Sequence, residues 1–229
     1  MLYGIDIYHG DVLESDLKGG PSDEDCFATI KENCAFVFLK ATQGIGVTDP
    51  LYHARRVAAQ AAELLIGAYH FNTGDTIPAQ VQHFLDAAKP DIDLEMALDF
   101  EDNKANQMTF DEMYYFLQLM NKELTKIAGK TRYATLYSGN RIKRFITAAD
   151  PATKLFLGLH KFWGCEYGPK FKMVDDNGKQ LPWNEPWIWQ FTGDGIGPNP
   201  HTFKGLITKA VDVNSYSGDL AALTGSWAR

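Results

Sequence analysis

Three acidic residues lie within four positions at the end of an apolar run, Met96-Ala97-Leu98-Asp99-Phe100-Glu101-Asp102. The apolar part is typical of a buried strand, in which residues two apart share a face. Asp99 and Glu101 are therefore expected to point the same way, with Phe100 packed behind them. Neighbouring carboxyl groups with little water repel each other, so one should keep its proton near neutral pH. Such a pair can cleave a glycosidic bond, although a strand ending in a solvated acidic turn would show the same residues.

Strand-like and helix-like segments alternate through the first two thirds of the chain. We predict strands at residues 2–8, 35–42, 65–71, 95–101 and 133–137, and helices at 22–33, 49–64, 77–88, 109–128 and 140–146. Beyond Pro151 we predict strands at 155–160, 187–191 and 210–213, with no good amphipathic helix. Alternation predicts a parallel sheet, and eight strands in 229 residues fit a closed α/β barrel, with residues 1–229 as one domain.

The active site of a barrel enzyme lies at the carboxyl ends of its strands. The residues expected at these ends are Asp6, Tyr69, His70, Phe71, Asp99, Glu101, Tyr137, Trp189, Gln190 and Asp212. Four acids from distant segments would then meet on one face, beside aromatic rings able to stack on sugars. Structural roles are the alternative. Asp6 and Asp212 could be strand-end acids held by backbone donors, His70 could support its strand, and the Tyr and Trp rings could pack at the rim.

Composition argues against several classes of partner. Lys and Arg number 22 and Asp and Glu 29, a net charge of −7 with no basic cluster. This balance argues against nucleic acid and against electrostatic attraction to an anionic membrane. Cys26, Cys34 and Cys165 lack metal-type spacing and are expected as reduced thiols, and the six histidines lack paired ligand spacing. We therefore predict no metal and, without a glycine-rich phosphate fingerprint, no cofactor.

The amino terminus lacks a basic region followed by an apolar stretch, so no signal peptide is expected. No apolar run approaches the roughly 18 residues that a membrane span needs. We expect a monomer that is made in the cytosol and reaches its site of action by release or by non-classical export.

Several motifs, taken in order, are similar to glycoside hydrolase family 25, the Chalaropsis-type lysozymes of bacteria, fungi and phages. They are Gly4-Ile5-Asp6, Phe36 to Gly44, Asp49-Pro50, Gly67-Ala68-Tyr69-His70-Phe71, Leu98-Asp99-Phe100-Glu101, Trp189-Gln190-Phe191 and Val211-Asp212-Val213-Asn214. The resemblance implies an irregular TIM-like (β/α)5(β)3 barrel that hydrolyses the β-1,4 bond between N-acetylmuramic acid and N-acetylglucosamine in peptidoglycan. It implies Glu101 as general acid, Asp99 as its partner carboxylate, and Asp6 and Asp212 as outer acids of the cleft.

Two mechanisms fit these acids. In the favoured one the substrate's own acetamido oxygen attacks the anomeric carbon, Asp99 stabilises the oxazolinium ion, and configuration is retained. In the other, Asp6 or Asp212 activates a water molecule and configuration is inverted.

The sequence departs from the usual family pattern in three places. Ile7-Tyr8-His9 replaces a small residue pair, Gln43 stands where Glu is common, and residues 163–184 form a longer segment. No appended wall-binding module is expected, which suits a phage or prophage endolysin. A non-catalytic peptidoglycan-binding barrel and a glycosidase for a related polymer such as chitin are the alternatives.

Overall fold

The computed structural model describes residues 1–103 and 106–229. Its strands are β1 (Leu2–Ile7), β2 (Cys34–Gln43), β3 (Val47–Thr48), β4 (Leu65–Phe71), β5 (Glu95–Asp99), β6 (Thr135–Ser138), β7 (Phe162–Cys165), β8 (Ile188–Thr192) and β9 (Asp212–Tyr216). Its helices are the 3-10 turn η1 (Glu14–Asp16) and α1 (Asp23–Lys31), α2 (Tyr52–Ala61), α3 (Ile77–Ala88), α4 (Phe110–Ala128), α5 (Asn140–Ile146), α6 (Pro151–Gly158) and α7 (Leu220–Ser226).

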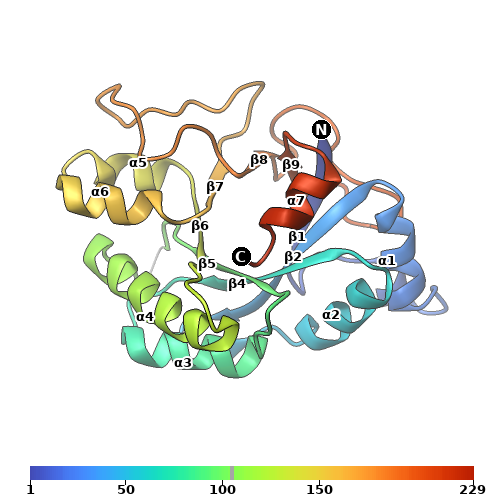
Figure 1. Ribbon diagram of the computed structural model, residues 1–229. Coiled ribbons are helices and arrows are strands. Elements are labelled where there is room, and N and C mark those ends of the chain that lie inside the picture. Colours follow the sequence, from blue (N-terminus) through green and yellow to red (C-terminus); the bar gives the residue numbers. More distant parts are fainter. Residues whose placement is uncertain (104–105) are drawn as a thin grey trace.

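Eight of these strands close into a barrel, with the helices around it (Figure 1). The order is β1-β2-β4-β5-β6-β7-β8-β9, and β9 pairs with β1 to complete the ring, while β3 forms a hairpin with β2. Five strand–helix units precede three strands that follow one another without helices. The predicted irregular (β/α)5(β)3 barrel is therefore confirmed.

The expectation of a purely parallel sheet is wrong for the last strand. β9 runs antiparallel to both β8 and β1, and Asp212 is its first residue rather than one of its last. Because the strand is reversed, its first residue still lies at the carboxyl end of β1, where Asp212 pairs with Asp6. The predicted convergence of these two acids survives although the direction of the strand was not foreseen.

The predicted strand at 155–160 is also wrong, because these residues mostly belong to helix α6. Asp150 caps that helix by accepting hydrogen bonds from the amides of Ala152 and Thr153, and Pro151 occupies its first turn. Leu155 is 73% exposed, so the apolar run is not a buried strand. The seventh barrel strand is β7, and α6 and α7 contradict the expected lack of helices beyond Pro151.

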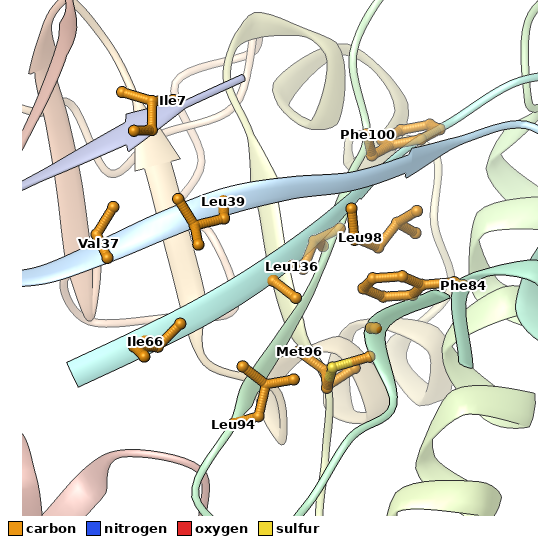
Figure 2. Packing of buried hydrophobic residues seen from close by; sticks show 14 of the residues in the cluster. Ile7, Val37, Leu39, Ile66, Phe84, Leu94, Met96, Leu98, Phe100 and Leu136 are labelled. Carbon is orange, nitrogen blue, oxygen red and sulfur yellow. The ribbon is translucent and has the colours of Figure 1, made fainter. Parts of the chain in front are cut away.

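The core has two layers that follow from side-chain alternation along the strands. Outward-facing residues such as Leu39, Leu98 and Leu136 pack against helix residues such as Phe84 (Figure 2). Inward-facing residues fill the barrel with aromatic rings, and the Phe38 ring stacks on that of Trp163 with centroids 4.1 Å apart. The outer face of the strands therefore packs against the helices. The inner face fills the barrel beneath the residues at its mouth.

The amino-terminal end of the barrel is closed by the chain's last residues. Trp227 packs on Phe36 and Phe38, and its indole N–H donates to the carbonyl of Ile66 over 3.0 Å. Figure 1 shows α7, in red, and the C-terminus in front of the strands. One end of the barrel is thus sealed by apolar packing, which leaves the carboxyl end for polar side chains. Among the described residues no helix is long and apolar enough to cross a membrane.

Candidate active site

A buried hydrogen-bond network holds Asp6 at the carboxyl end of β1. Asp6 Oδ2 accepts from Asn214 Nδ2 over 2.7 Å and from Gln190 Nε2 over 2.9 Å. Asn214 Oδ1, in the same side chain, accepts from Trp163 Nε1 over 2.6 Å. Gln190 Oε1 accepts from the Tyr137 hydroxyl over 2.8 Å. These side chains come from β1, β6, β7, β8 and β9, so the network fixes Asp6 across the barrel.

Asp99 is the last residue of β5 and points into the barrel from the position that pairs with Phe71. It is 6% exposed, and its Oδ1 atom has no hydrogen-bond partner within residues 1–103 and 106–229. The backbone around it is held firmly, since its carbonyl accepts from the side-chain amide of Asn72 over 2.9 Å. A buried carboxylate oxygen without a hydrogen-bond partner in those ranges is unusual in a folded protein, which marks Asp99 as a candidate functional residue.

Glu101 lies just beyond β5, in a segment that two buried side chains fix from behind. Its backbone carbonyl accepts from Asn72 Nδ2 over 3.0 Å and from Arg141 Nη1. The carboxyl group faces an open pocket of about 550 Å³, and its Oε1 atom lies 3.4 Å from the Tyr137 hydroxyl oxygen. The pocket is lined by Glu101, Asp102, Gly139, Asn140, Arg141, Cys165, Glu166 and Tyr167. Glu101 is therefore the member of the acid pair that borders open space.

Asp212 and Tyr167 meet above Gly193. A β-carbon placed on Gly193 would come within 2.1 Å of Asp212 Oδ1 and 2.3 Å of the Tyr167 hydroxyl oxygen, so both side-chain ends lie against this backbone position. Tyr167 belongs to the long segment at 163–184 and also lines the pocket beside Glu101. That segment therefore contributes directly to the site.

Burial dominates the electrostatics of the four acids. It raises the pKa of Asp6 to about 7, although the amides of Asn214 and Gln190 act in the opposite direction. Burial, followed by the charge of Asp6, raises the pKa of Asp212 to about 9. Burial and the charge of Glu101 raise the pKa of Asp99 well above its usual range, and burial raises that of Glu101. The four carboxyl groups are therefore not all ionised at neutral pH, and at least one of them carries a proton.

Lys40 is a cation close to this cluster. Its charge favours the ionised form of Asp99, while its own burial lowers the pKa of the ammonium. Lys40 Nζ donates to Gln43 Oε1 over 2.8 Å and lies 4.8 Å from the centre of the Phe71 ring. Gln43 is a neutral acceptor, so this hydrogen bond leaves the positive charge of Lys40 uncancelled at that position.

The predicted substrate-contacting residues divide between the two faces of the strands. Tyr69, Phe71 and Tyr137 face the barrel interior or its mouth, as predicted. Gln190 is fully buried beneath the acids and belongs to the Asp6 network.

His70 and Trp189 lie on the faces of their strands that point away from the barrel interior. His70 is 0% exposed and lies on the helix side of β4, where Thr42 and Gln80 hold its two ring nitrogens at 2.7 and 3.0 Å. The alternative of structural support describes it better. Trp189 lies on the face of β8 opposite to Gln190, and its indole N–H donates to the Glu166 carbonyl over 2.8 Å. Neighbouring strand residues point in opposite directions, so both side chains lie opposite to the inward-facing residues beside them.

Sequence reasoning missed several residues that shape the site. Asn214 and Lys40 could have been found by alternation, since each lies two residues from another inward-facing residue, Asp212 and Phe38 respectively. Arg141 and Tyr167 carry no such signal, because one comes from a helix and the other from an irregular segment. In the described part of the chain, no group of three or more His, Cys, Asp or Glu residues could hold a metal ion.

The site therefore combines a carboxyl group bordering a pocket, a buried carboxylate beside it, and two further acids across the barrel mouth. This arrangement can supply a proton to a leaving oxygen while stabilising positive charge nearby, as glycoside hydrolases do.

Comparison with known proteins agrees with this class. The chain matches the profile of Glycosyl hydrolases family 25 over residues 15–199, and it belongs to that family. The predicted family, and the prediction that the chain is a glycoside hydrolase of the lysozyme type, are confirmed. No curated protein sequence matches the chain.

Three solved structures show the same fold. The bacterial lysozyme from Streptomyces coelicolor has a TM-score of 0.74 at 19% identity, with 98% of this chain and 95% of that chain covered. A muramidase from Trichobolus zukalii has a TM-score of 0.68 at 19% identity, with 98% of each chain covered. The catalytic domain of an endolysin from bacteriophage P40 of Listeria monocytogenes has a TM-score of 0.63 at 19% identity, with 99% of this chain and 98% of that chain covered.

Proposed function

We propose that this family 25 glycoside hydrolase is an N-acetylmuramidase, which cleaves the β-1,4 bond between N-acetylmuramic acid and N-acetylglucosamine in peptidoglycan. The observation that carries the proposal is the convergence of Asp99 and Glu101 with Asp6 and Asp212 at the open end of the barrel. The names of the similar structures, which include a lysozyme, a muramidase and an endolysin, support the cell wall as the place of action.

Glu101 is the proposed general acid, and its surroundings support that role. It borders the pocket, so a leaving sugar oxygen can reach its carboxyl group. Burial raises its pKa, which keeps the proton available closer to neutral pH. Its backbone is fixed by Asn72 and Arg141, so the proton is held in one place.

Asp99 is the proposed stabiliser of an oxazolinium ion formed from the substrate's own acetamido group. Its Oδ1 atom is buried and has no partner among the residues that the structure describes, so an acetamide N–H would satisfy it. A carboxylate that receives this N–H also orients the acetamido oxygen toward the anomeric carbon. This geometry favours the substrate-assisted, retaining route over inversion, with Asp6 and Asp212 flanking the sugar.

The experiment is digestion of purified peptidoglycan, reduction of the new ends with borodeuteride, and mass spectrometry of the fragments. We expect deuterium on muramic acid, as cleavage after that sugar requires. Deuterium on glucosamine would contradict muramidase action. The absence of new reducing ends, with the protein still pelleting with the wall, would support a non-catalytic binding barrel instead.

A further inference from the structure

A continuous chain of hydrogen bonds runs beneath the acid cluster. Trp163 Nε1 donates to Asn214 Oδ1, and Asn214 Nδ2 donates to Asp6 Oδ2. Gln190 Nε2 donates to the same oxygen of Asp6, and the Tyr137 hydroxyl donates to Gln190 Oε1 over 2.8 Å. All five residues are buried, so water does not compete for these bonds.

The chain has a direction because one of its ends can only donate. An indole N–H has no acceptor, so Trp163 determines that the Asn214 amide presents its N–H, and not its oxygen, to Asp6. Asp6 accepts that bond and a second one from Gln190 Nε2, which leaves the side-chain oxygen of Gln190 facing Tyr137. The single hydroxyl proton of Tyr137 is used on this carbonyl oxygen.

Tyr137 therefore has only lone pairs to offer to its other neighbour, Glu101, whose Oε1 atom lies 3.4 Å away. We infer that Tyr137 and Gln190 are positioning residues that assign a proton to Glu101, whose carboxyl group donates it to the Tyr137 oxygen. A tyrosine proton directed at Glu101 would instead favour the carboxylate. The inference deepens the proposed function and rests on it for its meaning in catalysis.

Other charges around Glu101 act alongside this chain. Burial raises the pKa of Glu101 most, and a Tyr137 hydroxyl that donated to Glu101 would lower it. Asp102 and Asp194 oppose its ionisation, and Arg141 favours it. Asp99, Asp6 and Asp212 each interact with Glu101 electrostatically across the barrel mouth, and the Cys165 thiol lies on the same side. These groups influence how readily Glu101 ionises but do not determine the direction of the Tyr137 hydroxyl. A test must therefore change that direction and leave the charges in place.

The substitution Gln190→Met changes that direction, because it removes the acceptor of the Tyr137 proton. It also removes a hydrogen bond that favours the Asp6 carboxylate, so its effect is compared with a second variant that shares this loss. The hydroxyl is then free to donate to Glu101, which stabilises the carboxylate. We expect the pKa of Glu101 to fall by about one pH unit, a tenfold loss of proton affinity. The measurement is a carbon-13 NMR titration of protein labelled at the glutamate carboxyl carbons, with the Glu101 signal assigned from its loss in Glu101→Gln.

The double variant Tyr137→Phe/Gln190→Met is the matched control. Both variants lose the Gln190–Asp6 bond, but only the single variant keeps a Tyr137 hydroxyl that can donate to Glu101. The Glu101 pKa should therefore be lower in Gln190→Met than in the double variant. A Glu101 pKa that is unchanged or higher in Gln190→Met would overturn the inference. If that variant does not fold, Tyr137→Phe decides: a Glu101 pKa that falls supports the inference, because a proton acceptor has been removed, and a pKa that is unchanged or rises refutes it.

The titration needs no turnover, so it separates this inference from the proposed function. If Glu101→Gln still hydrolysed peptidoglycan, the proposed role of Glu101 would fail whatever the titration showed. If hydrolysis is lost and the titration shows no fall, Glu101 remains the acid and the account of Tyr137 and Gln190 is wrong.

Discussion

Glu95 and Asp99 lie at opposite ends of the same strand, β5, and both are buried inward-facing carboxylates. Glu95 accepts hydrogen bonds from Thr135 Oγ1, Lys161 Nζ and the Ala228 amide, each at 2.6 Å. Asp99 has one carboxylate oxygen without a partner in the described ranges, and Glu101, Asp6 and Asp212 all oppose its ionisation. The same residue chemistry is fully satisfied at one end of the barrel and left incomplete at the other.

The difference separates a carboxylate that stabilises the fold from one that is available to a ligand. A buried charge costs free energy unless it is paired and hydrogen-bonded. Glu95 meets that requirement with a lysine and joins three segments, including the end of the chain. Asp99 does not meet this requirement among the described residues, which is unfavourable for folding. A bound substrate that donates a hydrogen bond to Asp99 would compensate for this at the site.

Of the variants on strand β5, Asp99→Asn should have the larger effect on activity. The amide loses the negative charge that would stabilise an oxazolinium ion, so kcat/KM on peptidoglycan should fall by about 100-fold or more. Because the lost charge is poorly paired in the free protein, the melting temperature at pH 7 should hold or rise. A variant that is both active and less stable would show that Asp99 belongs with Glu95 among the structural carboxylates.

Glu95→Gln should lower the stability of the protein and retain its activity, which is the opposite of the result expected for Asp99→Asn. It leaves the Lys161 ammonium without its carboxylate and weakens the contact to the Ala228 amide. We expect a loss of about 3 kcal/mol in the free energy of unfolding, measured by denaturant titration. Activity per folded molecule should be retained, since Glu95 is remote from the barrel mouth. Lost activity at unchanged stability would contradict the comparison.

A smaller effect concerns the pH dependence of stability. The pKa values of Asp6 and Asp212 are about 7 and 9 in the folded chain, against ordinary values of 3.8. Between those ordinary values and the folded ones, the native state binds more protons than the unfolded state. Stability contributed by these groups is therefore present at low pH and lost as pH rises through about 7 to 9.

Asp212→Asn should reduce the loss of stability that accompanies rising pH. We expect the fall in melting temperature between pH 5 and pH 8.5 to shrink by a few degrees, as calorimetry would show. Asp176→Asn, in an exposed loop, is the control and should leave the fall unchanged. An equally steep fall in both variants would mean that Asp212 is not the group that resists ionisation.

The sequence predicted regular elements well where local signals are strong. β4 (Leu65–Phe71) and α3 (Ile77–Ala88) begin and end where the apolar pattern places them. α6 was missed because its apolar run outweighed the Asp150-Pro151 start signal. At the site, the acids could be foreseen from strand ends, but Arg141 could not, because its contact with Glu101 depends on packing between distant segments.

The most direct test of the whole account is the activity of Glu101→Gln on purified peptidoglycan, compared with Glu166→Gln. Both glutamates line the same pocket, but Glu166 is paired with Lys143 over 2.7 Å. We predict that Glu101→Gln reduces hydrolysis by about 1,000-fold while still pelleting with the wall, and that Glu166→Gln changes it by less than about tenfold. Retained hydrolysis in folded Glu101→Gln would contradict the account.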